Sequence, residues 1–166
     1  MPVFEEGFRI DAPPPAVWRV LDDPVRLGAC VPGCDEVVAE EADRFRVRLR
    51  VGVGPIRTTQ ELRLAVTERQ PPVRLAATGQ GEDRSLASRV SLRTSVDLRE
   101  AAGGSATDVA CRVEVQLTGR LATLGEAVMR AKSGQMVRTF AERLAAAVGP
   151  SAVAMADRPD DPPGRG

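Results

Sequence analysis

Two cysteines near the start of the chain, Cys30 and Cys34, are separated by three residues that include Pro32 and Gly33. Such a pair could bind a metal ion, form a redox couple or simply flank a turn. A structural zinc site takes four ligands, yet the sequence contains no histidine and only one further cysteine, Cys111. A redox couple more often has two intervening residues and opens a helix. Because proline and glycine suit the second and third positions of a type II turn, we predict a structural turn without a metal.

Residues that could act as general acids or bases are few. The sequence has no histidine and no tyrosine, so a catalytic mechanism would need carboxylates, the single lysine Lys132 or a cysteine. A cyclase or hydrolase would need paired carboxylates, for which Glu61, Asp97 and Glu114 are candidates. All three fall in predicted strands, where a solvent-facing charge is the ordinary explanation. These observations favour a binding protein without catalytic residues over an enzyme.

The composition is that of one globular domain. Apolar residues make up 43% of the 166 positions, and the formal net charge is zero, so no basic footprint for nucleic acid is present. The first residues lack the pattern of a signal peptide, and no apolar run approaches the roughly 20 residues of a membrane span. An odd number of cysteines without an export signal favours a reducing compartment. We therefore expect a cytoplasmic protein.

The first third of the chain predicts one strand followed by two short helices. Apolar residues in 3–10 are spaced two or four apart, as in a strand. Asp11 could cap a helix that begins in the prolines at 13–15 and carries an apolar stripe up to Leu21. A second short helix is expected from Pro24 to Ala29.

After the turn at Pro32 and Gly33 a strand is expected over residues 36–41, and strict alternation marks the strand that follows it. Between residues 44 and 51 four arginines, Arg44, Arg46, Arg48 and Arg50, alternate with the apolar residues Phe45, Val47, Leu49 and Val51. This pattern indicates a half-buried antiparallel strand. Further strands are expected over 56–68, 73–81, 87–100 and 107–119, with turn residues between them. The strands would form one antiparallel meander.

A long amphipathic helix should close the domain. From Leu121 to Val148 apolar residues recur at steps of three and four, a length of about 40 Å for about 28 residues. We expect Gly149 and Pro150 to stop this helix and residues 149–166 to form a disordered tail rich in proline and aspartate. The sequence thus predicts an α+β domain over residues 1–148. In it, a curved antiparallel sheet of six to seven strands wraps around the C-terminal helix.

A curved sheet around one helix commonly encloses a cavity, and few aromatic residues are available to fill it, at 3% of the chain. Small residues expected to face the core support this interpretation: Ala65, Ala76, Ala77, Ala110 and Ala131. Met129 and Met136 could adapt to an irregular ligand. Ten residues are expected to line the cavity: Trp18, Leu21, Phe45, Val47, Leu49, Leu64, Leu124, Val128, Met136 and Phe140. The alternative is a solidly packed core, because a core and a cavity lining have the same composition.

Three motifs resemble the G-subunit family of carbon monoxide dehydrogenase, which belongs to the START-like, or SRPBCC, helix-grip superfamily. They are the segments 12–34 (with Val17-Trp18, Asp23-Pro24 and Cys30-Val31-Pro32-Gly33-Cys34), 51–56 (Val-Gly-Val-Gly-Pro-Ile) and 119–125 (Gly-Arg-Leu-Ala-Thr-Leu-Gly). The resemblance covers about residues 3–148. It implies a non-catalytic accessory protein of a molybdenum hydroxylase of the carbon monoxide dehydrogenase type. It further implies a lipid or quinone-like ligand in the grip, no covalently bound cofactor, and recruitment of the enzyme to the inner face of the cytoplasmic membrane.

One feature departs from that family pattern. Members that attach to membranes often have a longer C-terminal extension with apolar or basic residues. Here the segment after Val148 is short, at 18 residues, and includes Asp157, Asp160 and Asp161, which anionic lipids should repel. We therefore expect at most a transient membrane contact. Two alternatives remain open, a START-like cyclase or hydrolase and a pure protein-interaction module. In the latter, the row Arg44, Arg46, Arg48 and Arg50 would dock an acidic partner, unless neighbouring carboxylates such as Glu61 neutralise it.

Overall fold

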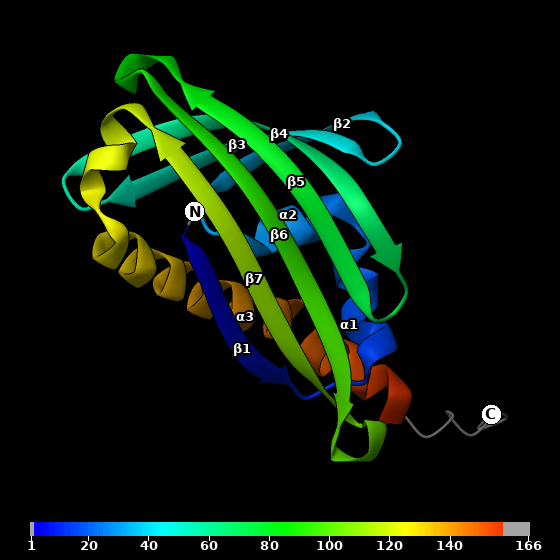
Figure 1. The fold of residues 1–166 in the computed structure, drawn as a ribbon. Helices are drawn as coiled ribbons and strands as arrows, with labels where there is room; N and C mark the ends of the chain where they lie inside the picture. Colours follow the sequence, from blue (N-terminus) through cyan, green and yellow to red (C-terminus); the bar gives the residue numbers. More distant parts are fainter. Residues whose placement is uncertain (1, 158–166) are drawn as a thin grey trace, which may run out of the picture.

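The computed structural model describes residues 2–157, with side chains up to residue 149. A seven-stranded antiparallel sheet in the order β1-β7-β6-β5-β4-β3-β2 carries two short helices and one long helix (Figure 1). The elements are β1 Val3–Ile10, α1 Pro14–Leu21, α2 Pro24–Cys30, β2 Cys34–Glu41, β3 Arg44–Val53, β4 Ile56–Gln70, β5 Arg74–Asp83, η1 Arg84–Leu86, β6 Ser88–Ala101, η2 Ala102–Gly104, β7 Ala106–Thr118, η3 Gly119–Leu124 and α3 Glu126–Asp157. The predicted α+β class and element order are confirmed.

The two short helices begin at prolines, where a missing amide hydrogen costs nothing because first-turn amides have no partner within the helix. The N-cap of α1 is Pro13 and makes no side-chain hydrogen bond, so the prediction that Asp11 caps this helix is wrong. In α2 the Asp23 carboxylate accepts hydrogen bonds from the amides of Val25 and Arg26, at 3.1 and 3.2 Å.

The turn between the two nearby cysteines is confirmed as type II. The amide of Cys34 donates to the carbonyl of Val31 at 3.2 Å, and Gly33 has a φ of +86°. A side chain at Gly33 would also clash with the carbonyl oxygen of Arg50 on β3. The glycine is therefore required twice, once for its backbone angle and once for the close approach of β3.

Successive side chains of a strand point to opposite faces of the sheet, so each strand residue can be assigned to one face. The inner face, which packs against α1 and α3, carries Phe45, Val47, Leu49 and Val51, while the four alternating arginines lie on the outer face, as predicted. The expectation that small residues line the interior is wrong for Ala65, Ala76 and Ala110. Cross-strand pairing places these three on the outer face beside Thr78, Ser95 and Asp97, respectively.

The long helix differs from the prediction at both ends. It begins at Glu126, because the preceding residues form the 3-10 segment η3, which glycines with positive φ bound on both sides, Gly119 at +73° and Gly125 at +82°. It continues through Pro150 to Asp157, so the predicted stop at Gly149 and Pro150 is wrong. A proline removes one helical hydrogen bond and can bend a helix without ending it. The rest of the predicted tail, residues 158–166, lies outside the described residues.

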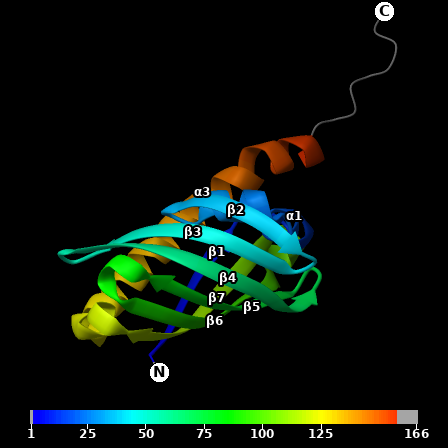
Figure 2. The same ribbon diagram turned by 90° about the horizontal axis from the view of Figure 1, so that it is seen from above.

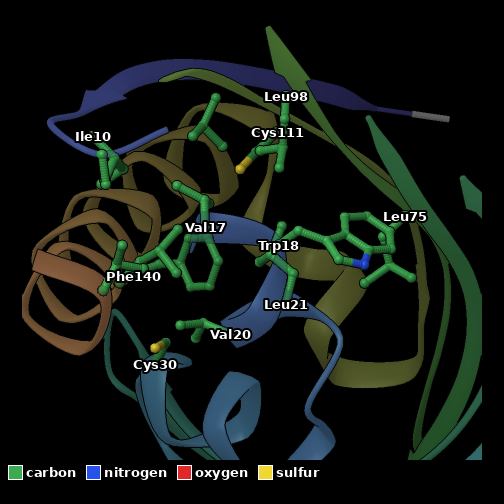
Figure 3. Close-up of a cluster of buried hydrophobic side chains, with 14 residues drawn as sticks. Ile10, Val17, Trp18, Val20, Leu21, Cys30, Leu75, Leu98, Cys111 and Phe140 are labelled. Carbon is green, nitrogen blue, oxygen red and sulfur yellow. The ribbon is translucent and has the colours of Figure 1, made fainter. Parts of the chain in front are cut away.

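Seen from above, α3 runs along the concave side of the sheet (Figure 2). It lies against β1 at one edge and approaches β3 near the other, while α1 and α2 pack beside its second half. The core gathers around these helices (Figure 3). Val17, Val20 and Leu144 are fully buried there. We call this part of the interior, formed by α1, α2, the second half of α3 and the adjoining strand ends, the closed end.

Candidate ligand-binding site

The opposite half of the inner face, under η3 and the first half of α3, is an apolar wall. Strand pairing aligns two rows of side chains across it: Phe45, Leu64, Gly79, Leu92 and Val115 in one row, and Val47, Leu62, Gly81, Val90 and Leu117 in the other. Val47 and Leu62 are buried, whereas the remaining apolar side chains of the wall are only half-buried. We call this half of the interior the open end.

Two glycines in the middle strand shape this wall. A Cβ atom at Gly81 would clash with the side chain of Leu62, and one at Gly79 would collide with Leu64 and press on Leu92. The side chains of Leu62 and Leu64 therefore pack directly against the backbone of Gly81 and Gly79 at the centre of the sheet. A larger residue at either position would push these leucines toward the helix and fill the space under α3.

A groove of about 270 Å³ lies between the end of β7 and the start of α3. Its apolar lining includes Val115, Leu117, Leu121 and Met129, and its polar lining includes Glu126. Val115 and Leu117 also belong to the wall, so the groove adjoins the open end at β7. The surface beside it, over Glu126, Ala127, Arg130 and Ala131, is a broad, open depression.

A polar corner borders the wall where β4 and β5 approach η1. The Asp83 carboxylate accepts hydrogen bonds from the Thr58 hydroxyl at 2.8 Å, the Thr59 amide at 3.1 Å, and the Ser85 hydroxyl and amide at 2.6 and 2.9 Å. These hydrogen bonds lower the pKa of Asp83 to about 2, and the bond from the Ser85 hydroxyl makes the largest contribution. Gln60 donates from Nε2 to the Thr58 hydroxyl oxygen at 2.9 Å.

The structure divides the ten expected lining residues into separate groups. Phe45, Val47 and Leu64 belong to the two rows of the open-end wall, and Leu49 lies on the same inner face opposite Gln60. Trp18, Leu21 and Phe140 belong instead to the core of the closed end. The other three occupy η3 and the first half of α3: Leu124 and Met136 are half-buried, and Val128 is 39% exposed.

Several residues of the groove were not among those ten. Val115 and Leu117 alternate within the predicted strand 107–119, so their inward direction was readable from the sequence. Leu121 and Met129 belong to the apolar pattern that led to the prediction of one continuous helix. The break at Gly125, which places them together over the end of β7, was not readable from that pattern.

None of the three thiols is activated for chemistry. Cys30, Cys34 and Cys111 are free, and burial raises the pKa of each, that of Cys111 to about 12. Among the side chains described, up to residue 149, no group of three or more is arranged to hold a metal ion.

The carboxylates considered for catalysis lie on the outer face of the sheet. Asp97 pairs with Arg74 at 2.8 Å, and Glu114 pairs with Arg112 at the same distance. Glu61 is exposed and stands opposite Arg48 and Glu82. The sheet therefore separates all three from the open end.

The arrangement of a curved sheet around a long C-terminal helix defines a START-like helix-grip protein. The chain is similar to a conserved protein from Geobacillus kaustophilus (TM-score 0.81, 18% identity, covering 92% of this chain and 97% of that one). It also resembles a START superfamily protein from Mycobacterium smegmatis (TM-score 0.61, 11% identity, 88% and 96%). A third similar structure is the Zhui aromatase/cyclase from Streptomyces sp. R1128 (TM-score 0.60, 16% identity, 95% and 96%). At these identities the similarity establishes the fold alone.

The sequence profile of CoxG, the G-subunit family of carbon monoxide dehydrogenase, matches residues 7–149, and the chain belongs to this family. Membership associates it with the carbon monoxide dehydrogenase system as an accessory protein. A search of curated proteins found no significant match. Among the described residues, no helix has the length and apolar character needed to cross a membrane.

Proposed function

We propose that this protein binds an apolar small molecule, a lipid or a quinone-like compound, at the open end of the grip. In this proposal it is a non-catalytic accessory protein of a molybdenum hydroxylase of the carbon monoxide dehydrogenase type, and it holds no covalent cofactor. The observation that carries the proposal is the half-buried apolar wall beside the groove, with Phe45, Leu64, Leu92, Val115 and Leu117. Such a surface inside a folded domain gains free energy when an apolar ligand covers it.

The positions of the acid–base groups support binding over catalysis. A START-like cyclase or hydrolase would need free ionisable side chains at the ligand, but Glu61, Asp97 and Glu114 lie behind the sheet. At the open end, Asp83 is held by four hydrogen bonds and Glu126 pairs with Arg130 at 3.0 Å. The three thiols have raised pKa values and are poor nucleophiles at neutral pH.

We further propose a cytoplasmic location with transient contact at the inner face of the membrane. The start of α3 supports this proposal, because Val128 is exposed and Lys132 follows four residues later on the same face of the helix. An exposed apolar side chain near a cation suits brief contact with anionic lipids. Such a contact would bring the groove close to a membrane-held ligand.

Native mass spectrometry of the purified protein, with lipid extraction and added short-chain menaquinone, tests ligand binding. The matched variants are Leu92→Gln on the inner wall and Ser91→Gln at the adjacent outer position of β6. We expect the wild type and Ser91→Gln to bind the probe and Leu92→Gln to lose at least about tenfold in affinity, since an amide would be placed in the apolar wall. A wild-type protein that carries no ligand on purification and does not bind the added menaquinone would contradict the proposal.

A further inference from the structure

The orientation of the Gln60 side-chain amide is determined by its neighbours. The Thr58 hydroxyl has one hydrogen, which it donates to the Asp83 carboxylate at 2.8 Å. Thr58 can then only accept from Gln60, so the nitrogen Nε2 must face Thr58, at 2.9 Å. The low pKa of Asp83, about 2, keeps its carboxylate a pure acceptor at neutral pH and preserves the direction of this chain. The oxygen Oε1 of Gln60 consequently points away from Thr58.

This oxygen is a buried acceptor without a hydrogen-bond partner among the described residues. The Gln60 side chain is only 4% exposed. Nearby hydroxyls are committed elsewhere, since Ser85 donates to Asp83 and Ser88 donates to the carbonyl of Leu86. Leaving such an acceptor unpaired is costly enough that native proteins rarely do so without a reason.

Strand register places Gln60 on the inner face of the sheet. It pairs with Leu49 of β3 and shares a face with Leu62 and Leu64 of the apolar wall. Leu49, directly opposite Gln60, is half-buried, whereas Leu62, the next inward side chain on β4, is buried, so the surface around Gln60 is partly accessible only on the β3 side. One hydrogen-bond acceptor therefore borders an otherwise apolar surface, the usual composition of a pocket for an apolar ligand with a polar head.

We propose that Oε1 of Gln60 accepts a hydrogen bond from a hydroxyl group on the head of the ligand. This inference rests on the proposed function and narrows the ligand class to apolar molecules with a hydroxyl donor. For a quinone-like ligand the dihydroxy, reduced form is favoured over the diketone. A ketone oxygen has no hydrogen to donate, and two facing acceptors would repel each other. A side chain of the wall must shift to admit the head, because the oxygen itself is covered.

The test compares two probes that differ only by methylation of the two hydroxyl groups, a short-chain prenylated naphthohydroquinone and its dimethyl ether, under anaerobic conditions. Affinities are measured by titration calorimetry for the wild type, for Gln60→Met and for Gln80→Met. Methionine matches glutamine in length without a strong acceptor, and Gln80 lies on the outer face of β5 as the matched control. We expect the wild type and Gln80→Met to prefer the hydroquinone by about tenfold, and Gln60→Met to bind both probes equally.

Other results would overturn the assignment. Equal affinities in the wild type, or an unchanged preference in Gln60→Met, would show that an internal water or another group satisfies Oε1, while the proposed function would stand. Binding of neither probe by the wild type would reject both proposals. The wild-type comparison needs no variant, so equal affinities would overturn the assignment even if Gln60→Met folds poorly.

Discussion

The two ends of the grip share one helix and one sheet but differ in how completely they are packed. At the closed end, α1 inserts Val17, Val20 and Leu21 between the sheet and the second half of α3, and α2 adds Cys30; these residues are at most 2% exposed. At the open end η3 buries Leu121, but most of the facing wall remains half-buried. A helix and a curved sheet alone therefore do not fill this interior. Additional elements close one end and leave the other available for a ligand.

The largest expected effect is the difference in unfolding free energy between a variant at the closed end and one at the open end. Leu144→Ala removes a fully buried side chain from the closed end and should lower the free energy of unfolding by about 3 kcal/mol, because it leaves a cavity. Val128→Ala truncates a side chain that is 39% exposed on the same helix and should cost less than about 0.5 kcal/mol. Urea unfolding measures both. Similar losses for the two variants would mean that the ends are equally packed.

The next prediction concerns Asp83, whose polar corner is the most firmly bonded part of the open end. Asp83→Asn should lower the free energy of unfolding by about 2 kcal/mol at pH 7, because hydrogen bonds to a charged acceptor are lost. The folded-state pKa of Asp83, about 2, lies below the ordinary value of 3.8. Its stabilisation is therefore complete above about pH 4 and is lost as the pH falls toward 2.

Urea unfolding of the wild type and Asp83→Asn at pH 7, 4 and 2.5 measures this dependence. The difference between the two proteins should shrink only at the lowest pH. Asp11→Asn, at an exposed loop position, is the control and should change the unfolding free energy little. A difference that stays constant down to pH 2.5 would contradict the assigned hydrogen bonds.

Thiol labelling probes whether the closed end stays closed. Cys34 is half-buried, whereas Cys111 lies in the closed core and its pKa is raised to about 12. With a maleimide at pH 8, Cys34 should react at least about tenfold faster than Cys111, because the reagent needs an accessible thiolate. Peptide mapping by mass spectrometry gives the two rates. Comparable rates would show that the closed end opens as readily as its periphery.

The smallest effect on stability is expected at the outer face, where the protein-interaction alternative can be tested. Arg48 and Arg50 pair with Asp35 at 2.8 and 2.9 Å, whereas Arg46 stands directly opposite Arg63. Like charges facing each other across strands repel, so this pair suits an acidic partner better than an isolated fold. The double variant Arg46→Glu, Arg63→Glu should change the unfolding free energy by less than about 0.5 kcal/mol.

Co-purification with the molybdenum hydroxylase is the second readout for that variant. Lost co-purification together with retained ligand binding would assign docking to the outer face and binding to the open end. Arg84→Glu, at a side chain that is 93% exposed, controls for the change in charge. Unchanged co-purification would leave the outer arginines without a docking role.

Much of the fold could be predicted because it depends on local patterns. The alternation at 44–51 correctly separated the arginines from Phe45, Val47, Leu49 and Val51, and the Pro32-Gly33 pair correctly indicated a type II turn. The helix boundaries were less accurate, because a 3.6-residue apolar pattern continues through Gly125, where the backbone turns. The inward direction assigned to Ala65, Ala76 and Ala110 failed because composition without register does not identify a face.

The candidate site was only partly predictable. Phe45 and Trp18 were both expected to line a cavity, yet one lies in the half-buried wall and the other in the closed core. Both are apolar and face inward, so the sequence offers no means to separate them. The difference depends on where α1 packs against distant strands.

By itself the sequence determined the class of fold, the family, the faces of most strands and the scarcity of acid–base groups. These features follow from residue types and from spacings over a few neighbours. Only the tertiary structure decided which end of the grip is filled and that Gln60 has an oxygen without a partner among the described residues. The reason is that Gln60 is oriented through Thr58 by Asp83, which lies 25 residues from Thr58 in the chain. Packing and hydrogen-bond direction over such separations arise only when the strands are brought together.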